Sequence, residues 1–213
     1  MFRTALLSVI LAAAAYGASA WLTHDFQVWT AEGARRLEVA LQPIAAPAVR
    51  IDGPGLALQP LSHILADGHS ITLLDFVYTR CRTVCTVLGS VFQQIQGTLQ
   101  ADGKTDAAAQ RVKLVSISFD EQYDSPQILE AYATRLGADP LLWRFLRVPD
   151  SRESRQLLAA LQVVVVPDGR GDFEHNAALL VIDQHGRLVR VFDYAESQLA
   201  IDYARDVAGH IAP

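Results

Sequence analysis

The sequence has little of what several common functions require. It contains only two cysteines in 213 residues, no run of lysine and arginine beside aromatic residues, and a formal net charge of −5. Nucleic acid is therefore not an expected partner, because binding to phosphates requires clustered cations. Two cysteines also exclude the framework of stapling disulfides that stabilises small domains with weak cores. What remains is an ordinary globular composition, 51% hydrophobic, long enough for one domain with an N-terminal extension.

The N-terminal segment lacks charge over a length that suits a membrane. Arg3 precedes an uncharged segment from Thr4 to Leu22, and Asp25 follows it. Nineteen helical residues span about 28 Å, close to the thickness of the hydrocarbon layer of a bilayer. The charges on either side predict a cytoplasmic N-terminus and an exported domain. We favour an uncleaved anchor over residues 1–24; the alternative is a signal peptide cleaved after Ala18-Ser19-Ala20, which also exports the domain.

The rest of the chain divides into a linker region and a domain. Residues 25–60 are predicted to form a juxtamembrane element and a linker or extended edge structure, because four prolines fall between 43 and 60. Residues 61–213 alternate strand and helix patterns, which indicates one α/β sheet with helices on its faces. The expected strands span 71–78, 112–119, 143–148, 179–182 and 188–192, and the expected helices span 84–100, 126–136, 151–161 and 197–209.

Helix ends are signalled by capping residues. Ser125 is predicted to cap the helix that Pro126 opens and Gly137 ends. Ser151 is predicted to cap the following helix.

The two cysteines lie where a buried strand is followed by a helix. Cys81 and Cys85 are four residues apart, so a helix would present both sulfurs on one face. The partial positive charge of the helix N-terminus stabilises thiolates, and Arg80 and Arg82 are expected to add to it. Two such thiolates suit a soft ion such as Cu(I), or they could form a disulfide. The alternative is a pair of buried, inert cysteines.

A third metal ligand is expected among the six histidines. His175 follows a glycine-rich loop, residues 167–173, and enters a strand; in a sheet of this order such a loop can lie over the end of the first strand. The residues alone leave His175 open between a ligand and a solvated or core histidine. The other histidines border the anchor, precede the first strand or are expected to be solvated: His24, His63, His69, His185 and His210.

Three segments together resemble the SCO/SenC family of copper chaperones for cytochrome c oxidase assembly. They are DFVYTRCRTVC (75–85), VKLVSISFDEQYDSP (112–126) and FEHNAALLVIDQHGRLVRVF (173–192), and the likeness runs from about Trp29 to Phe192. The resemblance implies a thioredoxin-like fold, a central mixed sheet flanked by helices, on an inner-membrane anchor. By position it makes Cys81, Cys85 and His175 the copper ligands.

The chain departs from the family pattern around the ligands. Arg82 and Thr86 stand where the family often has proline, and Glu174-His175-Asn176 stands where it usually has Asp-His-Ser. Asp120 and Asp124 match acidic family positions, and we interpret them as ordinary helix-entry aspartates. Asp75 either tunes a nearby thiol or lies on a strand at the edge of the sheet.

These observations predict a copper metallochaperone rather than an enzyme. Cys81, Cys85 and His175 are expected to hold Cu(I) in three-coordinate form, with Cu(II) as a second state. The domain would face the periplasm on a single-pass anchor and deliver copper to the dinuclear site of a cytochrome c oxidase subunit, with other copper chaperones as further partners. The alternative is a thiol-disulfide oxidoreductase using the same cysteines, although three residues separate them rather than the two of C-x-x-C. A peroxiredoxin-like peroxidase is the third option.

Overall fold

The computed structural model describes residues 2–23, 25–26, 28–80, 84–169, 173–176 and 178–211, with backbone only for 84–88 and 174. The chain forms two compact units, residues 1–42 and 43–213, and each is described by itself. The sheet and the predicted ligands belong to the second unit.

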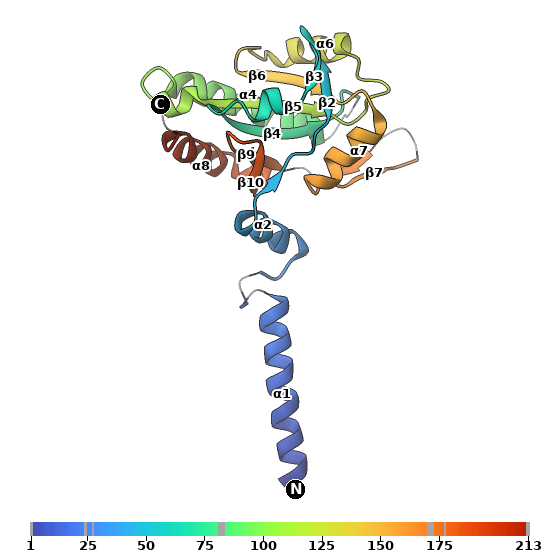
Figure 1. Cartoon of the computed structure of the whole chain (residues 1–213), viewed down its shortest axis with the longest axis vertical. Coiled ribbons are helices and arrows are strands. Elements are labelled where there is room, and N and C mark those ends of the chain that lie inside the picture. Colours follow the sequence, from blue (N-terminus) through green and yellow to red (C-terminus); the bar gives the residue numbers. More distant parts are fainter. Residues whose placement is uncertain are drawn as a thin grey trace. The chain divides into compact units, whose positions relative to one another are not determined.

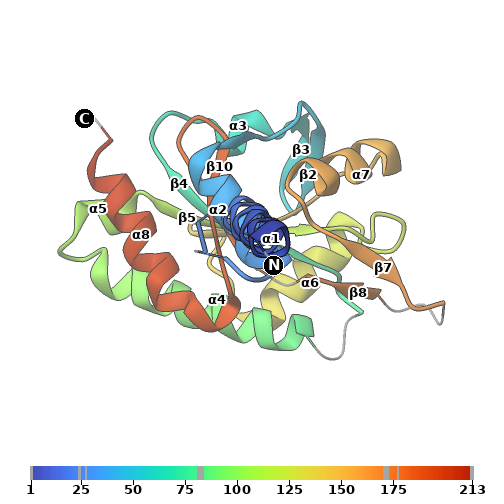
Figure 2. The same cartoon turned by 90° about the horizontal axis from the view of Figure 1, so that it is seen from below.

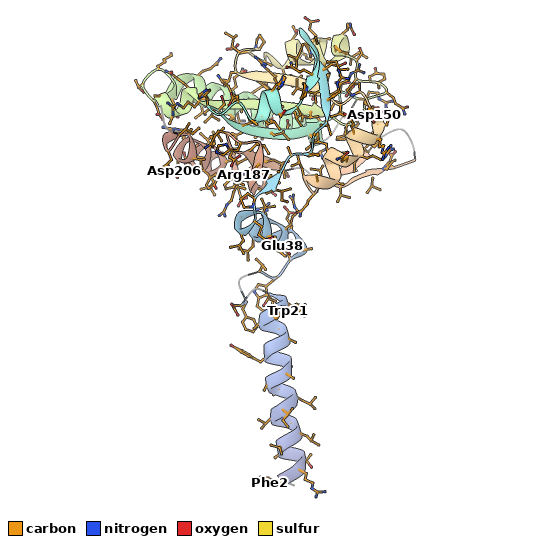
Figure 3. All side chains as sticks on the ribbon, in the orientation of Figure 1. Phe2, Trp21, Glu38, Asp150, Arg187 and Asp206 are labelled. Carbon is orange, nitrogen blue, oxygen red and sulfur yellow. The ribbon has the colours of Figure 1, made fainter. Side chains whose placement is uncertain are left out.

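The described residues of the first unit form two helices. α1 (Phe2–Leu22) is long and apolar enough to cross a membrane. Its apolar side chains, from Phe2 to Trp21, project outward on all sides of the helix (Figure 3). α2 (Ala31–Leu41) begins at Thr30, whose hydroxyl accepts a hydrogen bond from the Gly33 amide at 2.9 Å.

The second unit is built on a mixed sheet of eight strands (Figure 1). Their order is β1-β10-β9-β4-β5-β6-β2-β3; β4, β5 and β6 run parallel, whereas the other pairs are antiparallel. The strands are β1 (Ile44–Ala45), β2 (Arg50–Gly53), β3 (Leu56–Pro60), β4 (Ile71–Val77), β5 (Val112–Ser118), β6 (Trp143–Arg147), β9 (Leu179–Ile182) and β10 (Arg187–Phe192). A separate ribbon pairs β7 (Val165–Pro167) with β8 (Phe173–His175).

Helices pack on this sheet through alternate strand residues. Among those buried in the main core are Ile71, Leu73, Val112, Leu114, Leu179 and Val181, which meet side chains of α4, α6 and α8. Figure 2 shows α4, α5 and α8 side by side. The helices are α3 (Ser62–Leu65), α4 (Val84–Asp102), α5 (Ala107–Gln110), α6 (Pro126–Leu136), α7 (Ser151–Ala160), the 3₁₀ turn η1 (Tyr194–Glu196) and α8 (Ser197–Gly209).

The predicted helix ends are correct for one helix and wrong for another. Ser125 caps α6 by accepting a hydrogen bond from the Ile128 amide, and Gly137 ends it in the left-handed conformation, with φ of 64°. The cap of α7 is Asp150 and not Ser151, because the Asp150 carboxylate accepts hydrogen bonds from the amides of Arg152 and Glu153, both at 2.9 Å. A carboxylate reaches two unpaired amides of the first turn and also opposes the helix dipole.

The proline-containing region contributes strands at both ends of the sheet. β1 pairs with β10 at one end, whereas β2 pairs with β6 and β3 at the other. Residues 43–60, assigned from the sequence to a linker or to extended edge structure, are thus bonded into the same sheet as β4.

Candidate metal centre

The structure describes only some of the predicted ligands. Cys81 and Arg82 lie outside the described residues, and Cys85 is described only as backbone in the first turn of α4. His175 is described fully: it ends β8 and is partly buried. The described parts of the candidate site are therefore the surroundings of the imidazole and residues 78–80, which lead to Cys81.

The strand that carries His175 rests on the end of β4. Tyr78 follows β4 directly and is 1% exposed. Its ring meets that of Phe173 edge to face, with centroids 5.2 Å apart. The Tyr78 hydroxyl also lies 3.4 Å from both the Phe173 carbonyl, to which it donates, and the Phe173 amide, from which it accepts. These contacts join residues 95 positions apart in the sequence. Tyr78 lies three residues before Cys81, and Phe173 lies two residues before His175.

Four rings form an aromatic cluster at this point: Tyr78, Phe119, Phe173 and His175. Phe119 follows β5, so the parallel neighbours β4 and β5 bring Tyr78 and Phe119 to the same edge, with centroids 5.2 Å apart. Phe119 in turn meets Phe173 at 5.5 Å and the His175 imidazole at 5.3 Å, both edge to face. Edge-to-face packing is the arrangement that ring quadrupoles favour.

Burial within this cluster favours the neutral form of the imidazole. Removal from water lowers the pKa of His175 below its ordinary value, because the charged form loses hydration. The neutral imidazole is the form that binds metals.

Asp124 binds Thr79, which lies two residues before Cys81. Its side chain is fully buried and accepts three hydrogen bonds: from the Thr79 amide at 3.0 Å, from the Thr79 hydroxyl at 2.5 Å and from the Ser118 hydroxyl at 2.5 Å. Burial raises the pKa of Asp124, and these hydrogen bonds oppose that rise. The interpretation of Asp124 as an ordinary helix-entry aspartate is therefore wrong. Its contact with Thr79 spans 45 positions, which no local pattern reveals.

Arg80 is engaged on two sides. Its guanidinium donates to the Asp120 carboxylate at 2.6 and 3.2 Å and lies over the Tyr123 ring, 4.5 Å from its centroid. Asp120 is thus an ion-pair partner rather than an ordinary helix-entry residue. Because its carboxylate neutralises the guanidinium, Arg80 adds less positive potential for thiolates than the sequence suggested.

Asp75 is a buried carboxylate on the strand that leads to Cys81. β4 lies between β9 and β5, so the edge position considered from the sequence is wrong. Asp75 is 1% exposed and lies beside Ser116 on the neighbouring strand β5. The two side chains form a hydrogen bond. Burial raises its pKa to about 7, and the hydrogen bond from Ser116 opposes that rise. Its Oδ1 atom has no hydrogen-bond partner within the described part of the chain.

The other described histidines lie apart from this aromatic cluster, on the surface. His185 and His210 are exposed, as predicted, and so are His63 and His69. His63 Nδ1 contacts the Gln59 side chain at 3.3 Å, and His210 Nδ1 contacts the Asp206 carbonyl at 2.7 Å. His24 lies outside the described residues.

Comparison with known proteins identifies the family. The SCO1/SenC family model matches residues 67–211, about two thirds of the chain. The chain belongs to the SCO1/SenC family. The SCO1 protein homolog of Bacillus subtilis is 23% identical over 158 residues, covering 73% of this chain and 76% of that protein.

Solved SCO structures share its fold. ScoI of Bradyrhizobium japonicum, solved with copper bound, has a TM-score of 0.59 at 21% identity, covering 75% of this chain and 99% of the other. BsSco, described with a disulfide switch as a member of the Sco family of cytochrome c oxidase assembly proteins, has a TM-score of 0.66 at 17% identity, covering 79% and 96%. The expected thioredoxin-like fold, a mixed sheet flanked by helices, is confirmed.

Proposed function

We propose that this SCO1/SenC protein is a copper metallochaperone that binds copper through Cys81, Cys85 and His175. The observation that supports this most is the contact between Tyr78 and Phe173. Three residues of chain lead from Tyr78 to Cys81 and two lead from Phe173 to His175, and each residue spans at most about 3.6 Å. The short segments that lead from this contact to Cys81 and to His175 therefore limit the distance between the two residues.

The donor set suits copper as a cargo. Thiolates are soft ligands that select Cu(I), and a neutral imidazole completes a three-coordinate site. The cysteines lose their protons when copper binds, whereas the lowered pKa of His175 favours the neutral imidazole, whose free ring nitrogen can bind the ion directly. Transfer of the ion to an acceptor then requires only exchange of ligands, without breaking a covalent bond in a substrate.

The acceptor and the compartment complete the proposal. We assign the dinuclear copper site of a cytochrome c oxidase subunit as the acceptor, in line with the description of BsSco as an oxidase assembly protein. Helix α1, apolar and long enough to cross a membrane, would anchor the chain in the inner membrane by a single pass. Arg3 at the N-terminal end of α1 and Asp25 after it favour a domain that faces the periplasm.

An anaerobic Cu(I) titration of the full chain in detergent micelles tests the proposal. We expect the wild type to bind copper with charge-transfer absorption between thiolate and metal. His175→Ala should weaken binding by at least about tenfold, since it removes one of three ligands. His185→Ala, which removes an exposed imidazole from the β9–β10 turn, is the matched control and should bind as the wild type does. Equal binding by His175→Ala and His185→Ala would contradict the ligand assignment.

A thiol-disulfide oxidoreductase is the second candidate function. It is favoured by Asp75, a buried carboxylate on the strand leading to Cys81 with a pKa of about 7, which can accept a proton near neutral pH. The rate of disulfide exchange with a dithiol peptide distinguishes the two functions. An oxidoreductase should lose rate in Asp75→Asn and keep it in His175→Ala, whereas a metallochaperone should lose copper binding in His175→Ala.

A further inference from the structure

The strand that carries His175 ends at a clamp made by one side chain. Asn176 follows His175 and is the only asparagine in the chain. Its Oδ1 accepts a hydrogen bond from the Val164 amide at 2.7 Å, and its Nδ2 donates to the Gln162 carbonyl at 3.2 Å. Its own backbone amide donates to the Val164 carbonyl at 3.3 Å. Asn176 therefore binds the segment just before β7 at two residues, Gln162 and Val164.

The backbone that Asn176 holds is itself fixed by α7. The helix ends at Ala160 with Leu161 as its C-cap, and Gln162 then adopts a left-handed conformation, with φ of 57°. The Val163 amide donates back to the Leu158 carbonyl at 2.8 Å. A left-handed conformation is unfavourable for a residue with a side chain, so this turn persists only where contacts on both sides hold it. The Asn176 amide is the contact on the β8 side.

The clamp acts on the residue beside it. Successive side chains of a strand point to opposite faces, so the position of the backbone at residue 176 determines where the side chain of residue 175 points. In the structure the His175 imidazole packs edge to face with the Phe119 ring, with centroids 5.3 Å apart. We propose that Asn176 is a positioning residue for the copper ligand His175, and that its side-chain amide holds the imidazole against Phe119. This inference rests on the proposed function.

The chemistry of the clamp requires an amide. Only an amide offers an acceptor to the Val164 N–H and a donor to the Gln162 carbonyl at the same time. Asn176→Asp keeps the acceptor but loses the donor, and places a carboxylate oxygen against the Gln162 carbonyl. Asn176→Ser has a shorter side chain with a single hydroxyl, which cannot reach both partners.

The chain contains a second clamp of the same chemistry that serves as a matched control. Gln96, on α4, donates from Nε2 to the Gly137 carbonyl at 3.0 Å and accepts at Oε1 from the Asp139 amide at 2.8 Å. It joins α4 to the end of α6. Gln96→Glu makes the same exchange of donor for carboxylate as Asn176→Asp, but without contact with the ribbon of His175.

The experiment compares the full-length wild type with Asn176→Asp, Asn176→Ser and Gln96→Glu in detergent micelles. In the copper-free chains, NMR measures the cross-relaxation between the His175 and Phe119 rings and the hydrogen exchange of the Val164 amide. Competition with a chromophoric chelator then measures the affinity for Cu(I). Both Asn176 variants should lose the ring-to-ring signal, exchange Val164 faster and bind Cu(I) about 10–100-fold more weakly. Gln96→Glu should lower the thermal midpoint while keeping the ring signal and the affinity.

The outcomes separate the two hypotheses. If the Asn176 variants lose thermal stability but keep the ring signal and the affinity, as expected for Gln96→Glu, Asn176 is merely structural and the inference is wrong. If the wild type binds no copper, the proposed function is wrong and Asn176 has no role in copper binding. The NMR signals of the copper-free chains still show whether Asn176 positions the His175 ring, so the two failures can be told apart. Asn176→Ser keeps the test decisive if Asn176→Asp does not fold.

Discussion

The approach to the cysteine pair and the ribbon that carries His175 are held by different kinds of contact. Thr79 and Arg80, just before Cys81, are bound by the carboxylates of Asp124 and Asp120. The ribbon of His175 is held by ring packing on Tyr78 and Phe119 and by neutral hydrogen bonds from Asn176.

This difference bears on how a bound ion could be released. A hydrogen bond to a buried charged group contributes about 1.5–3 kcal/mol, and breaking it leaves a buried charge without a partner. An edge-to-face ring pair contributes only about 0.5–1.5 kcal/mol beyond its burial. We therefore expect Thr79 to stay in place while the His175 ribbon moves; under the proposed function, the imidazole would then be the ligand that leaves copper first.

The largest expected effect concerns Asp75, on the strand leading to the cysteine side. Because burial raises its pKa from 3.8 to about 7, the folded chain keeps a proton that the unfolded chain releases. Wild-type stability should therefore fall as pH rises from about 4 to about 7, by up to about 4 kcal/mol relative to Asp75→Asn. Urea unfolding at several pH values measures this. Asp206→Asn, at an exposed position on α8 (Figure 3), is the control and should run parallel to the wild type.

Removal of the Asp124 carboxylate, which binds Thr79, should have the second largest effect on stability. Asp124→Ala leaves three donors without their acceptor, two of them on Thr79, and should lower the free energy of unfolding by about 3 kcal/mol. Asp150→Ala, which removes the exposed cap of α7, should cost clearly less. Equal losses in urea unfolding would refute the special role of the buried carboxylate.

The ribbon side should respond more weakly to loss of a ring. Phe173→Ala removes the contacts with Tyr78 and Phe119, and should cost about 2 kcal/mol because Phe173 is only partly buried. Val166→Ala, on the same ribbon but 52% exposed, should have almost no effect on urea unfolding. If both variants unfold alike, ring packing does not hold the ribbon.

Arg80 should show the smallest effect. Its ion pair with Asp120 is partly exposed, so Arg80→Met should change stability by less than about 1 kcal/mol. Since Asp120 already neutralises the guanidinium, the alkylation rate of the reduced cysteines by iodoacetamide at pH 7 should also change by no more than about twofold. A much larger decrease in this rate would restore the interpretation of Arg80 as an activator of the thiolates.

The predicted strands and helices match the structure well where a local pattern carries the information. The apolar spacing of α4, and the Ser125 and Gly137 signals of α6, depend on residues within a few positions of each other. The cap of α7 was misassigned by one residue because Asp150 and Ser151 are both good caps, and only the geometry of the first turn selects between them.

The candidate site was predicted unevenly for the same reason. The cysteines and His175 stand in motifs that resemble a family, so they could be named from the sequence. The acceptor role of Asp124, the ion pair of Asp120 and the clamp at Asn176 depend on partners that are distant in sequence or on a particular turn. None of these contacts has a periodicity that a sequence pattern could reveal.

By itself the sequence determined an apolar N-terminal helix, an α/β domain and a dithiol at the junction of a strand and a helix. Each follows from composition or from spacing along the chain, which are local properties. Only the tertiary structure decided that the His175 ribbon rests on Tyr78, that Asp75 is in the centre of the sheet, and that Asp124 holds Thr79. These features arise where segments far apart in sequence exclude water together, since burial then alters both the strength of hydrogen bonds and the protonation of the groups that form them.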